Sequence, residues 1–424
     1  MPVVIASKPV TDLTPDIFAI APEAVSIAAF GDSLYMAVCR SVKEESSDVM
    51  DENAPIAIAE IHRYSDADKV WQRVEQHALV STTKAELAST LRCQLSAISG
   101  NGQTKLIAHF CGFGAQLLLA ASNHNNWQEW PSPVENSALI ESGLSHQGRL
   151  YLRSVASDGR MSLLTAEYSL DEDSASSPER WQSVALPERA EHGAAEHGAA
   201  EYGAAEYGAK GPVMTAWVSC ADGIYGAIAN PTCGFELWHL SQPSERWHQV
   251  HSSGLQRYSL NAQVRHMVPF QGSLYLVTAQ ASEDPLAEHA LEPVQIRFEL
   301  IRLYDNGDWD LLAGQPRFTP LGLRVPLLCK GPGFDSASGD AAYLVVHQNR
   351  LYLGFQSVEG FQLWRSSDGE VWTLLAVPEL SQYHQLQQFE TASTPFGLAM
   401  ACDAQTVPGA QSLSLFLYRD SDCM

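Results

Sequence analysis

The chain has 424 residues, is 45% apolar and carries a formal net charge of −23. It has no uninterrupted apolar run of the roughly 18 residues that a transmembrane helix needs, and its acidic excess argues against non-specific binding to nucleic acid or to anionic membranes. The N-terminal sequence MPVVIASKPVTDL lacks a basic region followed by a long apolar stretch, and the eight cysteines form no CxxC pair. These features predict a cytoplasmic protein with reduced thiols. The protein is also expected to be a monomer.

Along the chain, a unit of four short antiparallel strands recurs seven times. The second strand of each unit carries an apolar residue followed by tyrosine, or a degenerate copy of this dipeptide. The seven copies are Leu34-Tyr35, Leu106-Ile107, Leu150-Tyr151, Ile224-Tyr225, Leu274-Tyr275, Leu351-Tyr352 and Gly397-Leu398. Each copy follows a turn sequence such as Gln147-Gly148 or Gln271-Gly272, which is typical of a β-hairpin.

A tryptophan marks the fourth strand of the first six units. These residues are Trp71, Trp127, Trp181, Trp247, Trp309 and Trp372. Units four and six match closely, since Gly234–Trp238 reads GFELW and Gly360–Trp364 reads GFQLW. Seven such units predict an all-β fold, a seven-bladed β-propeller in a single domain over residues 1–424, with the recurring aromatic residues in the core.

The seventh unit lacks a tryptophan strand. An open blade edge is a liability in a β protein, so the strand-like run within Pro2–Lys8 is predicted to form the outer strand of this blade and to close the ring. Residues 188–212 are predicted to be a low-complexity insertion between blades three and four. They contain the repeat EHGAAEHGAAEYGAAEYGAK at Glu191–Lys210, in which regular glycines disfavour a helix.

The longest connections fall into the two loop classes that share one face of a propeller. They are Ser41–Pro55, Gln76–Arg92, Pro187–Pro212, Ala279–Pro293 and Gly314–Asp340. Three stretches of this face, Ser41–Pro55, Ala279–Pro293 and Glu188–Lys210, carry formal charges of −4, −4 and −3. Long loops on a rigid scaffold are the usual carriers of binding and catalysis, so we expect this acidic face to be the functional one.

Two motifs suggest chemistry that the rest of the chain does not support. Phe30-Gly31-Asp32-Ser33-Leu34 resembles the nucleophile block of GDSL-type hydrolases, but the partner Asp-x-x-His is missing, so Ser33 is interpreted as a turn residue. His248 and His251 are three apart in a strand and point to opposite faces. No metal site is predicted, and the sequence leaves the cofactor unknown.

Ser366-Ser367-Asp368-Gly369-Glu370-Val371-Trp372 resembles the Asp-box of sialidase-like propellers, one residue short. The resemblance implies a structural turn remote from any active site. More broadly, the LY…GFxLWRxxDGxxW unit is similar to repeats of bacterial β-propeller proteins. It also resembles the propeller half of cylindrocyclophane-type alkylating enzymes, although the calcium-binding domain of that family has no counterpart here.

The sequence leaves two functions open. The first is a binding scaffold that uses the long-loop face and the mouth of the central channel for a protein or a small ligand. The alternative is an enzyme of bacterial specialised metabolism, alkylating or otherwise tailoring, with its site at the same mouth. Polar residues near the loop ends are the predicted ligand-binding residues in both cases. They are Arg40, Asn230, Arg257, Asn261, Gln280 and Gln356.

Overall fold

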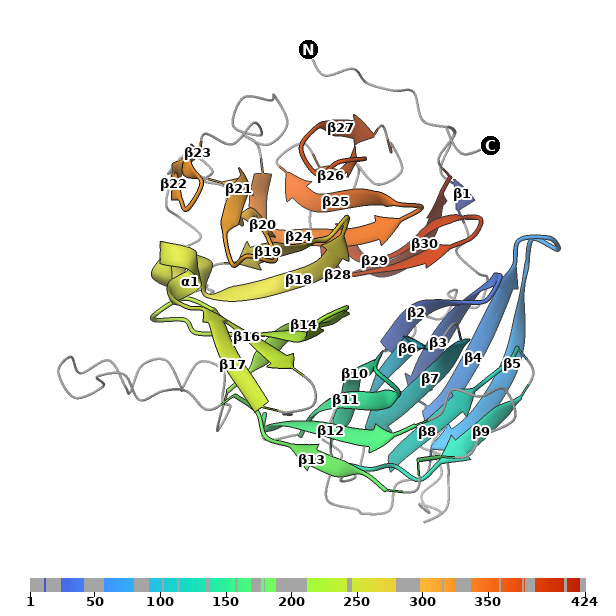
Figure 1. Ribbon diagram of the computed structural model, residues 1–424. Coiled ribbons are helices and arrows are strands. Elements are labelled where there is room, and N and C mark those ends of the chain that lie inside the picture. Colours follow the sequence, from blue (N-terminus) through green and yellow to red (C-terminus); the bar gives the residue numbers. More distant parts are fainter. Residues whose placement is uncertain are drawn as a thin grey trace.

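The computed structural model describes residues 11–12, 24–41, 57–79, 91–100, 103–112, 115–124, 126–134, 138–156, 159–168, 177–178, 180–187, 212–241, 246–279, 298–314, 316–324, 337–357, 360–375, 377, 386–407 and 410–419. Within them the chain forms seven four-stranded antiparallel sheets arranged around a common centre (Figure 1). The predicted seven-bladed β-propeller is confirmed.

Each of the first six blades is built from four consecutive strands. Blade one contains β2 (Ala24–Phe30), β3 (Ser33–Ser41), β4 (Ala57–Ser65) and β5 (Val70–Leu79), and blade two contains β6 (Arg92–Gly100), β7 (Gln103–Gly112), β8 (Ala115–Ala121) and β9 (Trp127–Trp130). Blade three contains β10 (Leu139–His146), β11 (Arg149–Val155), β12 (Met161–Glu167) and β13 (Gln182–Val184), and blade four contains β14 (Met214–Cys220), β15 (Gly223–Ile228), β16 (Glu236–Ser241) and β17 (Arg246–His251). Blade five contains β18 (Gln263–Phe270), β19 (Ser273–Ala279), β20 (Leu300–Leu303) and β21 (Trp309–Ala313), and blade six contains β24 (Ala337–His347), β25 (Arg350–Ser357), β26 (Gly360–Ser366) and β27 (Trp372–Leu375).

Blade seven combines both ends of the chain. Its strands are β28 (Leu386–Thr394), β29 (Gly397–Val407), β30 (Ala410–Tyr418) and the N-terminal β1 (Thr11–Asp12). β1 pairs antiparallel with β30, with Thr11 opposite Leu417 and Asp12 opposite Phe416. The N-terminal run predicted for this role, Pro2–Lys8, lies outside the described residues, and the outer strand that the structure describes begins at Thr11.

Three short elements lie outside the blade sheets. A one-turn helical segment, α1 (Ser253–Gln256), and a 3₁₀ turn, η2 (Tyr258–Asn261), lead into blade five. A two-stranded hairpin, β22 (Arg317–Thr319) and β23 (Gly322–Arg324), leads from blade five towards blade six.

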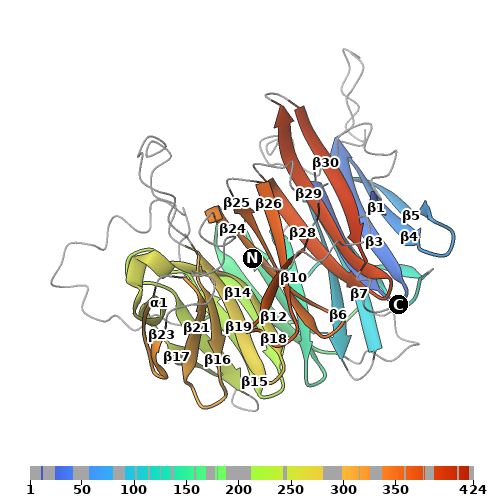
Figure 2. The same ribbon diagram turned by 90° about the horizontal axis from the view of Figure 1, so that it is seen from above.

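The first strands of the blades lie nearest the centre, and each contacts the first strand of the next blade, with β28 contacting β2 (Figures 1 and 2). These strands begin at the face where the strands on either side of residues 42–56, 80–90, 188–211, 280–297 and 325–336 end and begin. All five connections lie outside the described residues, the predicted insertion among them. We name this face the long-loop face, and the opposite one the turn face.

Type I′ turns join the first and second strands of several blades at the turn face. Both central residues have positive φ in Gln147-Gly148 (47° and 76°), Gln271-Gly272 (48° and 77°) and Gln348-Asn349 (46° and 55°). This turn type matches the right-handed twist of the strands it joins. The predicted hairpins therefore have the local backbone that their sequences indicate.

The marker dipeptides occupy the second strands as predicted. The side chains of Tyr35, Tyr151, Tyr275 and Tyr352 are at most 2% exposed, and burying an apolar side chain of this size contributes roughly 2 kcal/mol. Of the marker tryptophans, Trp309 is buried, whereas the other five are half-buried because the fourth strand is the outermost of its blade. The two GFxLW copies contain equivalent hydrogen bonds: Trp238 Nε1 donates to Glu236, and Trp364 Nε1 donates to Gln362.

The described cysteines carry free thiols. Cys39, Cys93 and Cys111 are buried, whereas Cys220 is half-buried and Cys233 is exposed. No helix among the described residues is long and apolar enough to cross a membrane.

Candidate functional site

The first strands of blades three, four and five each contain a β-bulge at the same place. Pairing of β10 with β11 passes from Ile140–Ser154 to Ser142–Arg153, so Glu141 has no partner in the ladder. Thr215 in β14 and Arg265 in β18 are left out of their ladders in the same way. The equivalence holds residue by residue, because each bulge lies opposite the second and third residues after Tyr151, Tyr225 or Tyr275. Bulges re-aim side chains and are frequent next to functional sites.

The three bulged residues line one cavity of about 450 Å³. It lies near the starts of β10, β14 and β18 and the end of β11, which places it at the long-loop end of the central channel. Its polar lining consists of Glu141, Arg153, Thr215, Gln263, Arg265 and His266, and its apolar lining of Val155, Met161, Val213, Met214 and Val264, with Gly159. We name it the channel-mouth cavity. Its size lies within the range of about 300–1,000 Å³ that is common for small-molecule sites.

One wall of the cavity is a half-buried ion pair. Arg153 Nη2 lies 3.3 Å from Glu141 Oε2, and Arg153 Nη1 donates a 2.8 Å hydrogen bond to the carbonyl oxygen of Met214. Burial lowers the pKa of Arg153, and the neighbouring carboxylate of Glu141 opposes this effect. The pair adds no net charge to the cavity, and it ties blade three to blade four.

Another part of the lining carries a positive charge from Arg265. This side chain is exposed, and within the described part of the chain it forms no hydrogen bond or ion pair. Beside it, the ring of His266 lies 5.2 Å from the ring of Tyr343 on β24. Burial lowers the pKa of His266 to about 4, and the positive charge of Arg265 lowers it further. At neutral pH His266 is therefore uncharged, and the two arginines and one glutamate give the lining a formal charge of +1.

The six residues predicted from the sequence fall into three groups. Gln280 lies outside the described residues, and Gln356 lies in β25 with its side chain outside the description. Arg40, at the end of β3, has its Nη1 atom 3.5 Å from Glu60 Oε2 in the same blade. The other three, described next, come together at the junction of blades four and five. The channel-mouth cavity is lined by other residues, so a binding role for the six stays a prediction.

Asn230, Arg257 and Asn261 belong to one buried network. Asn261 donates from Nδ2 to Glu299 Oε2 at 2.7 Å and accepts from Thr278 Oγ1 at 2.8 Å. Arg257 Nε lies 3.3 Å from Glu299 Oε1. The backbone N–H of Asn230 donates to the carbonyl of Ala262 at 2.8 Å, next to Gln263 of the cavity. The network thus fixes the segment that leads into β18.

The segment α1 within this network is left-handed. Ser253, Gly254, Leu255 and Gln256 all have φ between 53° and 68°, a conformation that costs L-residues roughly 1–2 kcal/mol each. Arg317 holds it in place by bonding both the carbonyl of Leu255 and the carboxylate of Glu299. Backbone strain that is enforced by the surrounding structure is frequent near functional sites. No sequence pattern in this segment predicts the left-handed conformation.

The two motifs with catalytic or metal-binding resemblance form other contacts. Ser33 Oγ donates to Asp32 at 3.0 Å, and His124 Nε2 lies 3.3 Å from the same Asp32 oxygen. The serine therefore bonds to the carboxylate rather than to a histidine, which fits its interpretation as a turn residue. His248 Nε2 lies 3.0 Å from His239 Nδ1. Among the described residues, no group of three or more His, Cys, Asp or Glu side chains could hold a metal ion.

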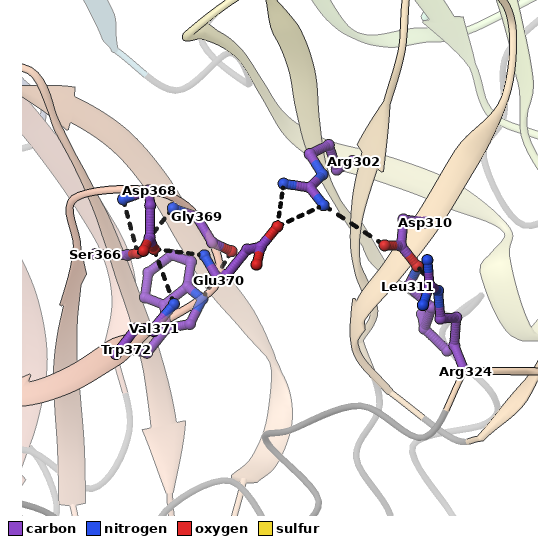
Figure 3. Close-up of polar contacts among 10 residues, drawn as sticks. All are labelled: Arg302, Asp310, Leu311, Arg324, Ser366, Asp368, Gly369, Glu370, Val371 and Trp372. Atoms are coloured by element: carbon purple, nitrogen blue, oxygen red, sulfur yellow. Dashed lines mark hydrogen bonds and ion pairs between the residues drawn. The ribbon is translucent and has the colours of Figure 1, made fainter. Parts of the chain in front are cut away.

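The Asp-box-like stretch forms a hydrogen-bonded turn between β26 and β27 on the turn face (Figure 3). Asp368 Oδ1 accepts the N–H groups of Glu370 at 2.8 Å and Val371 at 2.9 Å. Burial opposes ionisation of Asp368, but these donors outweigh it and lower its pKa. Figure 3 shows Arg302 of blade five between Glu370 and Asp310, with 3.1 Å bonds to Glu370. The turn thus joins blade six to blade five, at the end of the blades opposite the channel-mouth cavity.

No family model and no curated protein matches this sequence. Among solved structures, the chain is similar to puromycin hydrolase, with a TM-score of 0.50, 11% identity and coverage of 99% of this chain and 58% of that one. A Mycobacterium tuberculosis puromycin-hydrolyzing peptidase gives a TM-score of 0.49, 10% identity and coverage of 98% and 56%. Trypanosoma rangeli sialidase in complex with sialic acid gives 0.37, 7%, 98% and 58%.

These likenesses concern the fold alone. The chain spans less than two thirds of each of these three proteins, at 56–58% of their length. Fold and site together define a seven-bladed β-propeller with a charged cavity at one end of its channel.

Proposed function

We propose that this β-propeller is a binding scaffold that takes a small ligand in the channel-mouth cavity. The observation that carries the proposal is the set of three consecutive bulges, which bring Glu141, Thr215 and Arg265 to one cavity. Each bulge removes pairing locally and re-aims a side chain, and the three side chains re-aimed in this way lie at a single cavity.

The buried network beside the cavity supports the proposal. Asn230, Arg257 and Asn261 fix the backbone immediately before Gln263, Arg265 and His266. Binding sites need side chains held in place by a second layer of buried contacts. In this proposal the three predicted residues position the cavity strand, while Arg40, Gln280 and Gln356 belong to the surrounding long-loop face, where acidic connections would select what reaches the cavity.

The test is ligand-dependent stabilisation of the intact protein. Thermal unfolding is measured with a panel of small organic acids, amines, amides and sugars, for the wild type and for Gln263→Trp, which fills the cavity. Gln128→Trp on the exposed outer strand β9 is the matched control. We expect some members of the panel to raise the melting temperature of the wild type and of Gln128→Trp but not of Gln263→Trp. Equal stabilisation of all three proteins, or of none, contradicts the proposal.

The enzyme alternative has one observation in its favour, the four ionisable side chains in the cavity. They are Glu141, Arg153, Arg265 and His266. Proton transfer is most efficient when the pKa of the catalytic group lies near the working pH, whereas the pKa of His266 is about 4 and Glu141 is paired with Arg153. We therefore rank binding first. Recovery of a panel compound unchanged after long incubation with the protein supports binding, and its conversion supports the enzyme.

A further inference from the structure

We infer that the ligand of the channel-mouth cavity is an amphipathic organic anion, whose carboxylate or phosphate binds Arg265 and whose apolar body lies against the valine and methionine side chains of the cavity. This inference rests on the proposed function and specifies its ligand class.

The charge of the cavity favours an anionic ligand. Arg153 is already bound to Glu141 and to the carbonyl of Met214. Arg265 has no counter-ion among the described residues, and its bulge directs it to the cavity rather than along the sheet. A guanidinium offers a planar pair of donors that matches the two oxygens of a carboxylate or phosphate. An anionic ligand supplies the partner that Arg265 lacks.

Uncharged polar groups surround the same point. Gln263 lies two residues before Arg265 on β18, and its side chain, like that of His266, forms no hydrogen bond within the described residues. Because His266 stays neutral at physiological pH, it offers an N–H donor without adding a second full charge. The site therefore suits one acidic group with additional neutral hydrogen bonds, rather than a polyanion.

The remaining lining defines the rest of the ligand. Val155, Met161, Val213, Met214 and Val264 supply apolar surface, and methionine adapts to ligands of irregular shape. A cavity of about 450 Å³ takes a molecule with one acidic group and a single ring or short chain. A fully polar acid leaves this surface without contacts, which favours an amphipathic ligand.

The formal net charge of the protein, −23, repels an anionic ligand. At physiological ionic strength, however, charges farther away than about 8 Å are largely screened. Direct contact with Arg265 therefore decides binding at equilibrium, and added salt weakens the distant repulsion as well as the contact. We expect the affinity for the anion to depend only weakly on salt between 50 and 300 mM.

The experiment compares acids with uncharged molecules of the same shape. Binding of phenylacetate, phenyl phosphate and phenylacetamide to the intact protein is measured by calorimetry and by ligand-observed NMR. Arg265→Gln is the test variant and Arg265→Lys the conservative one. Arg246→Gln, an exposed arginine on the outer strand β17, is the matched control. Melting temperatures are recorded for all variants.

We expect at least one acid to bind the wild type and Arg246→Gln about tenfold more tightly than the amide. In Arg265→Gln this preference should vanish, and in Arg265→Lys it should be partly retained. The two acids distinguish a carboxylate from a phosphate ligand.

If the acids and the amide bind equally and Gln263→Trp loses all binding, the cavity is a binding site but its ligand is not specifically an anion. If none of the three compounds binds, both the proposed function and the inferred ligand class are wrong. A melting temperature that falls in Arg265→Gln, without any preference for acids in the wild type, assigns Arg265 a partner inside the chain and also overturns the inference.

Discussion

Glutamates at the junctions between blades are stabilised in two different ways in this molecule. Glu236 and Glu299 accept hydrogen bonds from polar or cationic side chains, including Asn230 and Asn261. Glu390 on β28 instead accepts from the backbone N–H of Ile27 at 2.7 Å, with the hydroxyl of Ser26 also donating. Burial raises the pKa of Glu390 to about 7, and these two donors oppose the increase. We therefore expect the junction of blades seven and one to be sensitive to pH through Glu390.

The first prediction concerns this carboxyl group. Its folded-state pKa of about 7 lies above the ordinary value of 4.5, so between these values the folded protein holds a proton that the unfolded chain has released. Stability contributed by this group then falls as pH rises through that window. We expect Glu390→Gln to match the wild type at pH 4 and to exceed it at pH 8 by on the order of 2 kcal/mol.

Urea denaturation across this pH range measures the effect. His266 changes stability in the opposite direction, because its lowered pKa favours folding as pH rises from about 4, so the informative quantity is the difference between Glu390→Gln and the wild type. Glu129→Gln, on the exposed outer strand β9, is the control. Parallel curves for Glu390→Gln and the wild type would show that Glu390 is ionised in the folded state without cost.

Strands and turns differ in how far their sequences reveal them. The Leu-Tyr dipeptides, the tryptophans and the Gln-Gly turns repeat, and they predicted the second strands, fourth strands and hairpins correctly. The bulges that build the channel-mouth cavity could not be found in this way. Ile140-Glu141-Ser142, Met214-Thr215-Ala216 and Val264-Arg265-His266 share no residue type at the bulge, and a one-residue slip near a strand end leaves the apolar alternation almost unchanged.

Arg40, Asn230, Gln280 and Gln356 are predicted site residues because they lie four or five residues after a marker tyrosine, and Arg257 and Asn261 because they lead into blade five. Such positions locate strand ends but not neighbours across blades, and in the structure Asn230, Arg257 and Asn261 lie at one junction. The sequence could not show that the side chain of Asn261 bonds to Glu299 and Thr278, because Glu299 lies 38 residues after Asn261. Long-range partners of this kind depend on the ring and not on local sequence.

The second prediction concerns the Asp-box-like turn. Asp368→Ala removes the acceptor of two backbone N–H groups and should lower the free energy of unfolding by about 1 kcal/mol, as loss of a comparable helix cap does. Gly369→Ala should cost more, because a Cβ atom would lie 2.2 Å from Tyr275 Oη and the residue has a φ of 76°. Ser367→Ala, with an exposed side chain, is the control.

Chemical denaturation gives these energies, and the acid-binding assay described above is run in parallel. We expect ligand affinity to be unchanged in all three variants, since the turn lies on the face opposite the cavity. Loss of affinity in Asp368→Ala at unchanged stability would assign the turn a direct part in binding.

At the scale of the whole molecule, contacts between blades are distributed around the ring. His146 bonds to Ser219 across blades three and four, and His347 bonds to Ser393 across blades six and seven. Arg419 pairs with Asp66 across blades seven and one. Each blade buries its apolar faces against its neighbours, so a local change that respects these contacts should leave the ring intact.

The third prediction applies this reasoning to the repeat at Glu191–Lys210. Pro187 and Pro212, on either side of the connection, lie in the described residues and line a groove with Met161 and Leu186. Replacing Glu191–Lys210 with a short Gly-Ser linker should change stability by less than about 1 kcal/mol, since loop closure costs only about 0.6 kcal/mol per doubling of length. Calorimetry measures the change. Failure of this variant to fold would show that the repeat packs on the propeller.

The last prediction concerns closure of the ring by the N-terminal strand. β1 pairs with β30 through Thr11 and Asp12, so deleting Met1–Asp12 exposes the edge of β30, whereas deleting Met1–Lys8 leaves that pairing in place. We expect the longer deletion to lower the melting temperature by on the order of 2–5 °C and to promote self-association through the free edge.

A chain in which Met1–Lys8 is replaced by a Gly-Ser sequence of equal length separates the effect of sequence from that of length. An equal loss in both deletions would show that Pro2–Lys8 contributes to the outer strand as the sequence predicts. Two unchanged melting temperatures, with both proteins monomeric by light scattering, would mean that the ring is held by the contacts between β28 and β2 without the N-terminal strand.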